Sequence, residues 1–206
     1  MKNKRTVLNR EEQLTTCASC AVGFSKLQAP SDGAWYIAIV LNNTEIASRN
    51  RLIQLGYDAY VPAQQEMHKW KDGRTKMREN VLLKNLVFVH TTEGKRKMLI
   101  EFPFIRKFLT DTARKRTPFT QSPVAIIPNS QIEDLKFMLS HCNEEITIEP
   151  LSVHIGDRVK IVRGKLAGLQ GYIFKEAGKS KVGILIDGIG YACTYLPITD
   201  LHIINQ

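Results

Sequence analysis

The sequence predicts an α+β unit followed by a small all-β unit. Helical and strand patterns alternate up to about residue 143, and helical periodicity then disappears. Beyond that point, apolar runs punctuated by glycine recur as about five short strands, which is typical of a small closed barrel. A chain of 206 residues is long enough for two such units.

The chain divides into four segments. Residues 1–33 are polar and show no sustained periodicity, which predicts a flexible leader. The α+β unit is expected at residues 34–143, a linker at 144–152 and the barrel at 153–206.

The first unit begins with a nearly continuous apolar run, residues 35–41, which predicts a central strand covered on both faces. A helix is expected next, between the capping residues 42–44 and Gly56. Its predicted buried stripe contains Ile46 and Ile53 and is widened by Leu52 and Leu55, which turns Arg51 toward water.

A second strand is predicted at residues 57–62, followed by a hairpin whose Asp72-Gly73 pair indicates a two-residue loop. In that register one face of the hairpin carries five cations, namely Lys69, Lys71, Arg74, Lys76 and Arg78. Because like charges facing each other destabilise a sheet, this face favours a place near phosphates. A fully solvated hairpin tip is the alternative.

The remaining elements complete an α+β sandwich. Residues 82–89 predict another buried strand, 95–102 a short helix and 105–109 a fourth strand. A capping box of Ser130 with Glu133 predicts the start of a last amphipathic helix. The helices are expected to cover a mainly antiparallel sheet.

The composition indicates a soluble, basic protein. The 29 basic and 20 acidic side chains give a formal charge of +9, which weakly favours a polyanionic partner. The longest apolar run is far below the roughly 20 residues that cross a membrane, and no signal peptide is recognisable, so we expect a cytoplasmic protein. Cys17 and Cys20 lack a second ligand pair, which predicts reduced thiols, with a metal or redox protein as the alternative.

No motif for catalysis is present in the sequence. It contains no nucleophile elbow, phosphate-binding loop or zinc-protease motif, and its histidines are scattered. We therefore expect a protein that is not an enzyme and needs neither cofactor nor metal.

Two stretches of the sequence are typical of particular domain families. Residues 156–164 (GDRVKIVRG) with 166–173 (LAGLQGYI) resemble a KOW motif, which belongs to an SH3-like barrel. Trp35-Tyr36, a basic hairpin and residues 82–89 (LLKNLVFV) resemble, in this order, the N-terminal (NGN) domain of NusG-type transcription factors. The resemblance covers residues 34–206.

The resemblance implies binding. In this family the NGN domain docks through an apolar depression on the β′ clamp helices of RNA polymerase and suppresses pausing, while the KOW domain recruits a partner such as NusE or Rho. By position, Ile39, Leu83, Leu86 and Phe88 match the docking pocket. Residues 83–86 read Leu-Lys-Asn-Leu where relatives have an aromatic, Pro, Gly or Asn, and then Tyr, so this pocket is aliphatic.

Specialised relatives also contact non-template DNA through the first helix. Arg49 and Arg51 occupy matching helical positions. The leader and the Leu-Lys-Asn-Leu segment resemble the UpxY-type paralogues, which regulate capsular polysaccharide operons. The prediction is a monomeric elongation or antitermination factor; the alternative is a KOW-containing RNA-binding or ribosome-associated protein.

Overall fold

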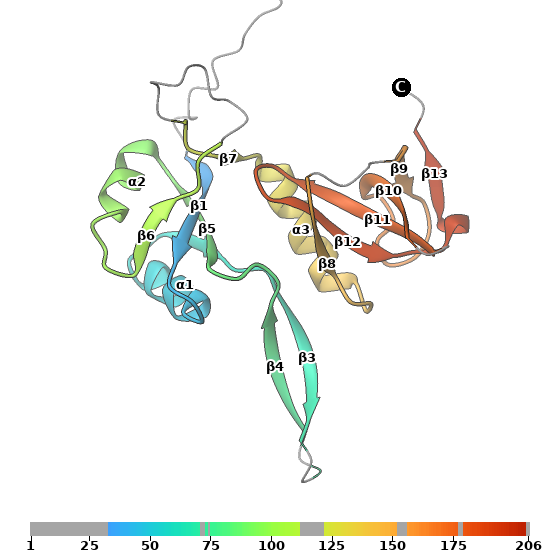
Figure 1. The fold of residues 1–206 in the computed structure, drawn as a ribbon, viewed down its shortest axis with the longest axis horizontal. Coiled ribbons are helices and arrows are strands. Elements are labelled where there is room, and N and C mark those ends of the chain that lie inside the picture. Colours follow the sequence, from blue (N-terminus) through green and yellow to red (C-terminus); the bar gives the residue numbers. More distant parts are fainter. Residues whose placement is uncertain are drawn as a thin grey trace, which may run out of the picture.

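The computed structural model describes residues 33–70, 73, 75–111, 122–151, 156–176 and 179–204. It confirms an α+β fold with antiparallel sheets and an all-β C-terminal part (Figure 1). The predicted leader, with Cys17 and Cys20, lies outside the described residues apart from Gly33.

The first sheet is built around β1 (Ala34–Val40), the predicted central strand. The order is β2-β5-β1-β6, with β7 also pairing with β1, and every pairing is antiparallel. The other strands are β2 (Asp58–Tyr60), β5 (Leu86–Thr91), β6 (Ile105–Phe108) and β7 (Ile126–Ile127). Residues 82 and 83, expected in a strand, lie in the turn before β5.

Helices cover both faces of this sheet. On one face, α1 (Glu45–Gln54) and α2 (Glu93–Leu99) contribute Leu52 and Leu99 to a core with alternate residues of β1 and β5.

 Leu52 and Leu99 are both fully buried there. On the other face, α3 (Asn129–His141) covers Ile37 and Phe88. The packing of helices on the sheet therefore agrees with the predicted sandwich (Figure 1).

The side of the first helix that faces the core agrees only in part with the predicted stripe. Glu45, Ser48 and Leu52 are its buried residues, whereas Ile53 is 51% exposed and Ile46 is only partly buried. The small Ser48 lets the helix approach the sheet closely, and the carboxylate of Glu45 is satisfied by a backbone N–H. Of the predicted stripe, Leu52 is confirmed as a core residue, whereas Ile46, Ile53 and Leu55 are not in the core. Arg51 is exposed as expected.

The helix α2 carries a buried cation, Arg96, on the side that faces the sheet. Arg96 donates from Nε and Nη2 to the carboxylate of Glu93 at 2.7 and 2.6 Å. Its guanidinium also lies 5.7 Å from the ring centroid of Tyr36 and 5.2 Å from that of Phe108. The hydrogen bonds from Arg96 hold the pKa of Glu93 below its ordinary value. Ionised Glu93 thus neutralises a charge that the sheet would otherwise bury alone.

Replacing this carboxylate should make stability less dependent on pH. We expect Glu93→Gln to lower the unfolding free energy at pH 7 by about 1 to 2 kcal/mol, because Arg96 loses a charged acceptor. A depressed folded-state pKa stabilises the fold above the unfolded pKa, and this stabilisation disappears as the pH falls through the folded value. Urea unfolding from pH 7 to pH 3 should therefore show the two proteins converging in acid; a constant difference would contradict this account.

The basic hairpin is present, but its register differs by one residue. The strands β3 (Ala63–Lys69) and β4 (Thr75–Val81) form a separate two-stranded sheet that projects from the body (Figure 1). Lys69 pairs with Thr75 and Met67 with Met77, so residues 70–74 form the connection instead of two residues.

This register removes the predicted five-cation face. Arg78 lies opposite Glu66, and position 76 lies opposite His68, so positions 76 and 78 share one face while position 69 belongs to the other. Lys71 and Arg74 lie outside the described residues, as do the side chains of positions 69 and 76. The Asp72-Gly73 pair correctly predicted where the chain turns. The connection is longer than the predicted two residues, and this shifts the pairing of the two strands by one residue.

The start of α3 also differs from the prediction. Pro128 is the N-cap residue and makes no side-chain capping hydrogen bond, so the expected capping box is absent. Glu133 instead accepts a hydrogen bond from Asn129 Nδ2 at 2.6 Å, and Asn129 Oδ1 accepts one from Trp35 Nε1 at 2.9 Å. This second bond ties the helix to β1.

The C-terminal part is a single antiparallel sheet with the order β13-β9-β10-β11-β12-β8. Its first strand, β8, lies within the segment expected to be a linker and pairs with β12. Within the described residues, β13 and β8 are the two edge strands of this sheet. The strands are β8 (Thr147–Pro150), β9 (Arg158–Ile161), β10 (Gln170–Glu176), β11 (Lys179–Ile186), β12 (Gly190–Tyr195) and β13 (Leu201–Ile203).

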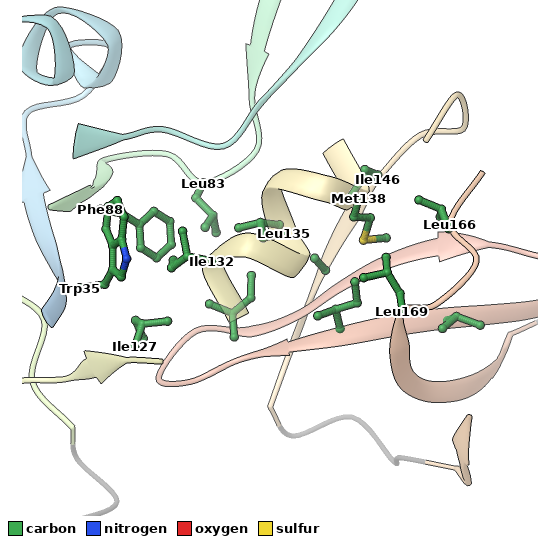
Figure 2. Close-up of a cluster of buried hydrophobic side chains, with 14 of the residues drawn as sticks. Trp35, Leu83, Phe88, Ile127, Ile132, Leu135, Met138, Ile146, Leu166 and Leu169 are labelled. Carbon is green, nitrogen blue, oxygen red and sulfur yellow. The ribbon is translucent and has the colours of Figure 1, made fainter. Parts of the chain in front are cut away.

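One continuous apolar core joins the two parts, with α3 between them. Ile132 and Leu135 lie on the side of Phe88 and Leu83, and Met138 lies beside Ile146 (Figure 2). The same cluster includes Leu166 and Leu169 from the turn between β9 and β10. A hydrogen bond of 2.9 Å from the Asp187 N–H to Gln131 Oε1 adds a polar contact. The helix therefore packs against both sheets.

Candidate functional site

A groove lies between α1 and the hairpin strand β4. It has a volume of about 1130 Å³. Residues of α1 and the turn before it line one wall, and consecutive residues of β4 line the other. The lining residues used below are Asn43, Ile46, Arg49, Asn50, Met77, Arg78, Glu79, Asn80, Val81 and Lys84, with Glu45 and Glu66.

A hydrogen bond ties α1 to the turn that follows β4. Glu45 Oε1, at the start of α1, accepts the backbone N–H of Asn85 at 2.7 Å. Asn85 has a φ of 66°, and its carbonyl accepts the N–H of Val40 at 2.8 Å. The turn that carries Lys84 is thus fixed to both β1 and α1, which sets the spacing of the groove.

The groove is electrically balanced. Arg49, Arg78 and Lys84 bring three positive charges, and Glu45, Glu66 and Glu79 bring three negative ones. Arg49 donates from Nε and Nη2 to Asn50 Oδ1 at 3.2 and 3.1 Å, and Asn80 Nδ2 donates to Glu66 Oε1 at 2.8 Å. Such a balance weakens the long-range attraction of a polyanion but leaves the arginines able to donate directional hydrogen bonds to a phosphate.

The residues predicted to contact nucleic acid are only partly brought together. Arg49 and Arg78 line the same groove. Arg51 lies elsewhere, because its guanidinium is 5.7 Å from the ring centroid of Phe104. For Lys69 and Lys76 the structure describes only the backbone pairing within the hairpin.

Seven polar residues of the groove were not predicted as site residues, namely Asn43, Glu45, Asn50, Glu66, Glu79, Asn80 and Lys84. Asn43 has a φ of 59°, a conformation that asparagine tolerates better than most residues. That backbone geometry is not visible in the sequence. Ile46 was predicted as core and instead lines the groove.

The residues predicted to dock on a partner share one face of the first sheet. Ile39 pairs with Leu86 across β1 and β5, and Phe88 follows on the same face. Phe88 is completely buried and Leu83 is 7% exposed, since α3 covers both (Figure 2). Ile39 and Leu86 remain partly exposed. In this arrangement Ile39 and Leu86 are therefore the accessible pair of the four, and Leu83 and Phe88 lie covered beside them.

Beside this face, Lys136 makes cation–π contacts with two aromatic rings. Its Nζ lies 4.9 Å from the ring centroid of Trp35 and 5.1 Å from that of Tyr60. Burial raises the pKa of Tyr60 to about 12, so its phenol stays protonated at neutral pH. Both rings and the ammonium group are thus committed to packing α3 on the sheet.

Neither a metal site nor a membrane span is found in the described part of the chain. No group of three or more His, Cys, Asp or Glu side chains is arranged there to hold a metal ion. No described helix is long and apolar enough to cross a membrane.

Comparison with known proteins defines the class. Residues 33–135 match the sequence profile of the family NusG, described as "Transcription termination factor nusG". The match covers half of the chain and includes the first sheet, the hairpin and most of α3. The protein therefore belongs to the NusG family of transcription factors.

Two solved structures are similar. One is described as "Domain interaction in Thermotoga maritima NusG", with 16% identity, coverage of 84% of this chain and 98% of the other, and a TM-score of 0.42. The second is described as "Crystal Structure of MjSpt4:Spt5 complex conformation B", with 18% identity, coverage of 84% and 97%, and a TM-score of 0.26. Comparison with curated proteins finds no match.

Proposed function

We propose that this protein is a transcription elongation or antitermination factor that docks on RNA polymerase and suppresses pausing or termination, without catalysing a reaction. The observation that carries the proposal is the NusG-family match over residues 33–135, which spans both surfaces described above. Capsular polysaccharide operons are the proposed targets, and the KOW region is the proposed site for a partner such as NusE or Rho.

The proposed polymerase contact is the apolar face next to α3. Ile39 and Leu86 supply its accessible part, and Leu83 and Phe88 lie beside them under α3. Its partner is the pair of β′ clamp helices. Docking there acts by differential binding, because a factor shifts the balance between paused and elongating polymerase only by binding one state more tightly.

A charge placed on this face should abolish docking. We expect Leu86→Glu to lose retention on immobilised β′ clamp helices, because binding would bury an unpaired carboxylate. The matched control is Leu55→Glu, which changes an exposed leucine at the end of α1 and should bind like the unaltered protein. Circular dichroism checks that both variants fold. Equal retention of the Leu86→Glu variant would show that the contact lies elsewhere.

The proposed nucleic-acid contact is the groove between α1 and β4, continued by the basic hairpin. Arg49 and Arg78 both line the groove and can each bind phosphate or a base edge. The proposed ligand is the non-template DNA strand. Arg51, which lies over Phe104, is assigned a smaller part.

Removing the two groove arginines should flatten the salt dependence of binding. For single-stranded DNA each lost phosphate contact lowers the slope of log K against log salt by about 0.7, so Arg49→Ala with Arg78→Ala should lower it by about 1.4. Fluorescence anisotropy at several salt concentrations measures this. Arg51→Ala is the control and should leave the slope nearly unchanged. An unchanged slope in the double variant would exclude the groove.

The alternative of an RNA-binding or ribosome-associated protein is tested by the same titration. Tight, strongly salt-dependent binding of ribosomal RNA without retention on the clamp helices would replace the proposed function.

A further inference from the structure

The projecting hairpin carries exposed apolar side chains far from any core. Met67 and Met77 face each other across β3 and β4 and are 73% and 55% exposed, and Trp70, just beyond β3, is 57% exposed. None of the three belongs to a buried cluster of the described residues. The exposed part of the indole offers a ligand one of the largest apolar surfaces that a side chain provides.

The turn holds Trp70 at the far end of the hairpin. The N–H of Gly73 donates to the Trp70 carbonyl at 3.0 Å, and Gly73 has a φ of +84°. The hairpin itself points away from both sheets (Figure 1). The indole is thus presented beyond the body of the protein, where a long ligand can reach it.

The charge of the hairpin sequence indicates the kind of partner. Residues 69–78 contain five basic side chains and a single acidic one, Asp72. A polyanion complements the charge of this segment. In a duplex, however, the bases are stacked on each other, so an indole at the tip of the hairpin meets only phosphates and groove edges. Single-stranded nucleic acid combines phosphates with accessible flat bases, so it fits both the cations and the aromatic ring.

We propose that Trp70 stacks on an unpaired base of single-stranded nucleic acid. This inference rests on the proposed nucleic-acid contact of the hairpin and adds a base-stacking residue to it. Stacking does not depend on base identity, since every base has an aromatic face. Trp70 therefore contributes affinity for unpaired strands over duplexes, without selecting a sequence.

The chain contains two tryptophans, which makes the test direct. Trp35 is 3% exposed and hydrogen-bonded to Asn129, so a ligand at the surface should quench only Trp70. The full chain is titrated with a 12-nucleotide single strand of mixed sequence, with a strand of the same length made of abasic residues, and with the corresponding duplex. The intact single strand should quench the fluorescence, and the abasic strand and the duplex should not.

Affinity measured by anisotropy provides the second arm. Trp70→Leu should weaken the intact single strand about tenfold and leave the abasic strand unchanged, and Trp70→Phe should retain most of the affinity. The matched control is Met67→Leu, which alters an exposed apolar residue on the shaft and should bind normally.

Each outcome decides between the claims. If Trp70→Leu binds the intact single strand as well as the unaltered protein does, stacking is wrong while the proposed nucleic-acid contact stands. If no strand binds at all, the proposed contact and the stacking both fail. If Trp70→Leu weakens only retention on the clamp helices, Trp70 is a protein contact and the inference is overturned.

Discussion

Leu135→Ala should destabilise the protein by about 2 to 5 kcal/mol, the range for removing a fully buried leucine. Leu135 is completely buried on α3, within the cluster that continues from Phe88 under the first sheet to Ile146 at the second (Figure 2). A cavity at this point loosens the contacts of the helix with both parts. Urea unfolding followed by circular dichroism and by tryptophan fluorescence measures the loss.

Phe137→Ala is the matched control on the same helix. Phe137 is partly exposed and stacks on His141 with ring centroids 4.2 Å apart, so its truncation leaves no closed cavity. We expect a loss below about 1 kcal/mol. If Leu135→Ala costs no more than this control, α3 does not lie between two packed surfaces.

Gly190→Ala should cost roughly 3 kcal/mol or more and separate β8 from β12. Gly190 has a φ of +153°, and a Cβ at this position would lie 2.1 Å from the carbonyl oxygen of Glu149. Because the obstacle is the paired backbone of β8, no side-chain rotation relieves it. Thermal unfolding measures the loss, and hydrogen exchange of the β8 amides locates it.

Gly164→Ala separates backbone strain from this collision. Gly164 has a φ of +82°, but no heavy atom lies within 4 Å of the position of its Cβ. The expected cost is the left-handed conformation alone, about 1 to 2 kcal/mol. Equal losses at both glycines would mean that the close approach of β8 and β12 contributes nothing.

Some of the candidate site could be read from residue types. Arg49 and Arg78 were predicted for nucleic acid and do lie in one groove, because Arg49 is partly exposed on α1 and Arg78 lies on an exposed strand. Arg51 differs from Arg49 by two helical positions, and that rotation brings it over Phe104 instead. The balancing carboxylates Glu66 and Glu79 come from the hairpin register, which no local pattern specified.

The sequence by itself determined the class of fold and the order of elements. Apolar periodicity, Pro, Gly and Asp-Gly punctuation act over a few neighbouring residues, so they predict that a strand, a helix or a turn forms. They placed β1, α1, the hairpin and α3 correctly in outline.

Only the tertiary structure decided which surfaces are covered. Ile53 is exposed and Glu45 buried on α1, residues 147–150 form β8 inside an expected linker, and α3 covers Leu83 and Phe88. Burial depends on contacts between segments far apart in the chain, and a one-residue change in pairing exchanges the two faces of a hairpin. An apolar stripe therefore predicts that something packs on it, but not which part of the chain, or which partner, does so.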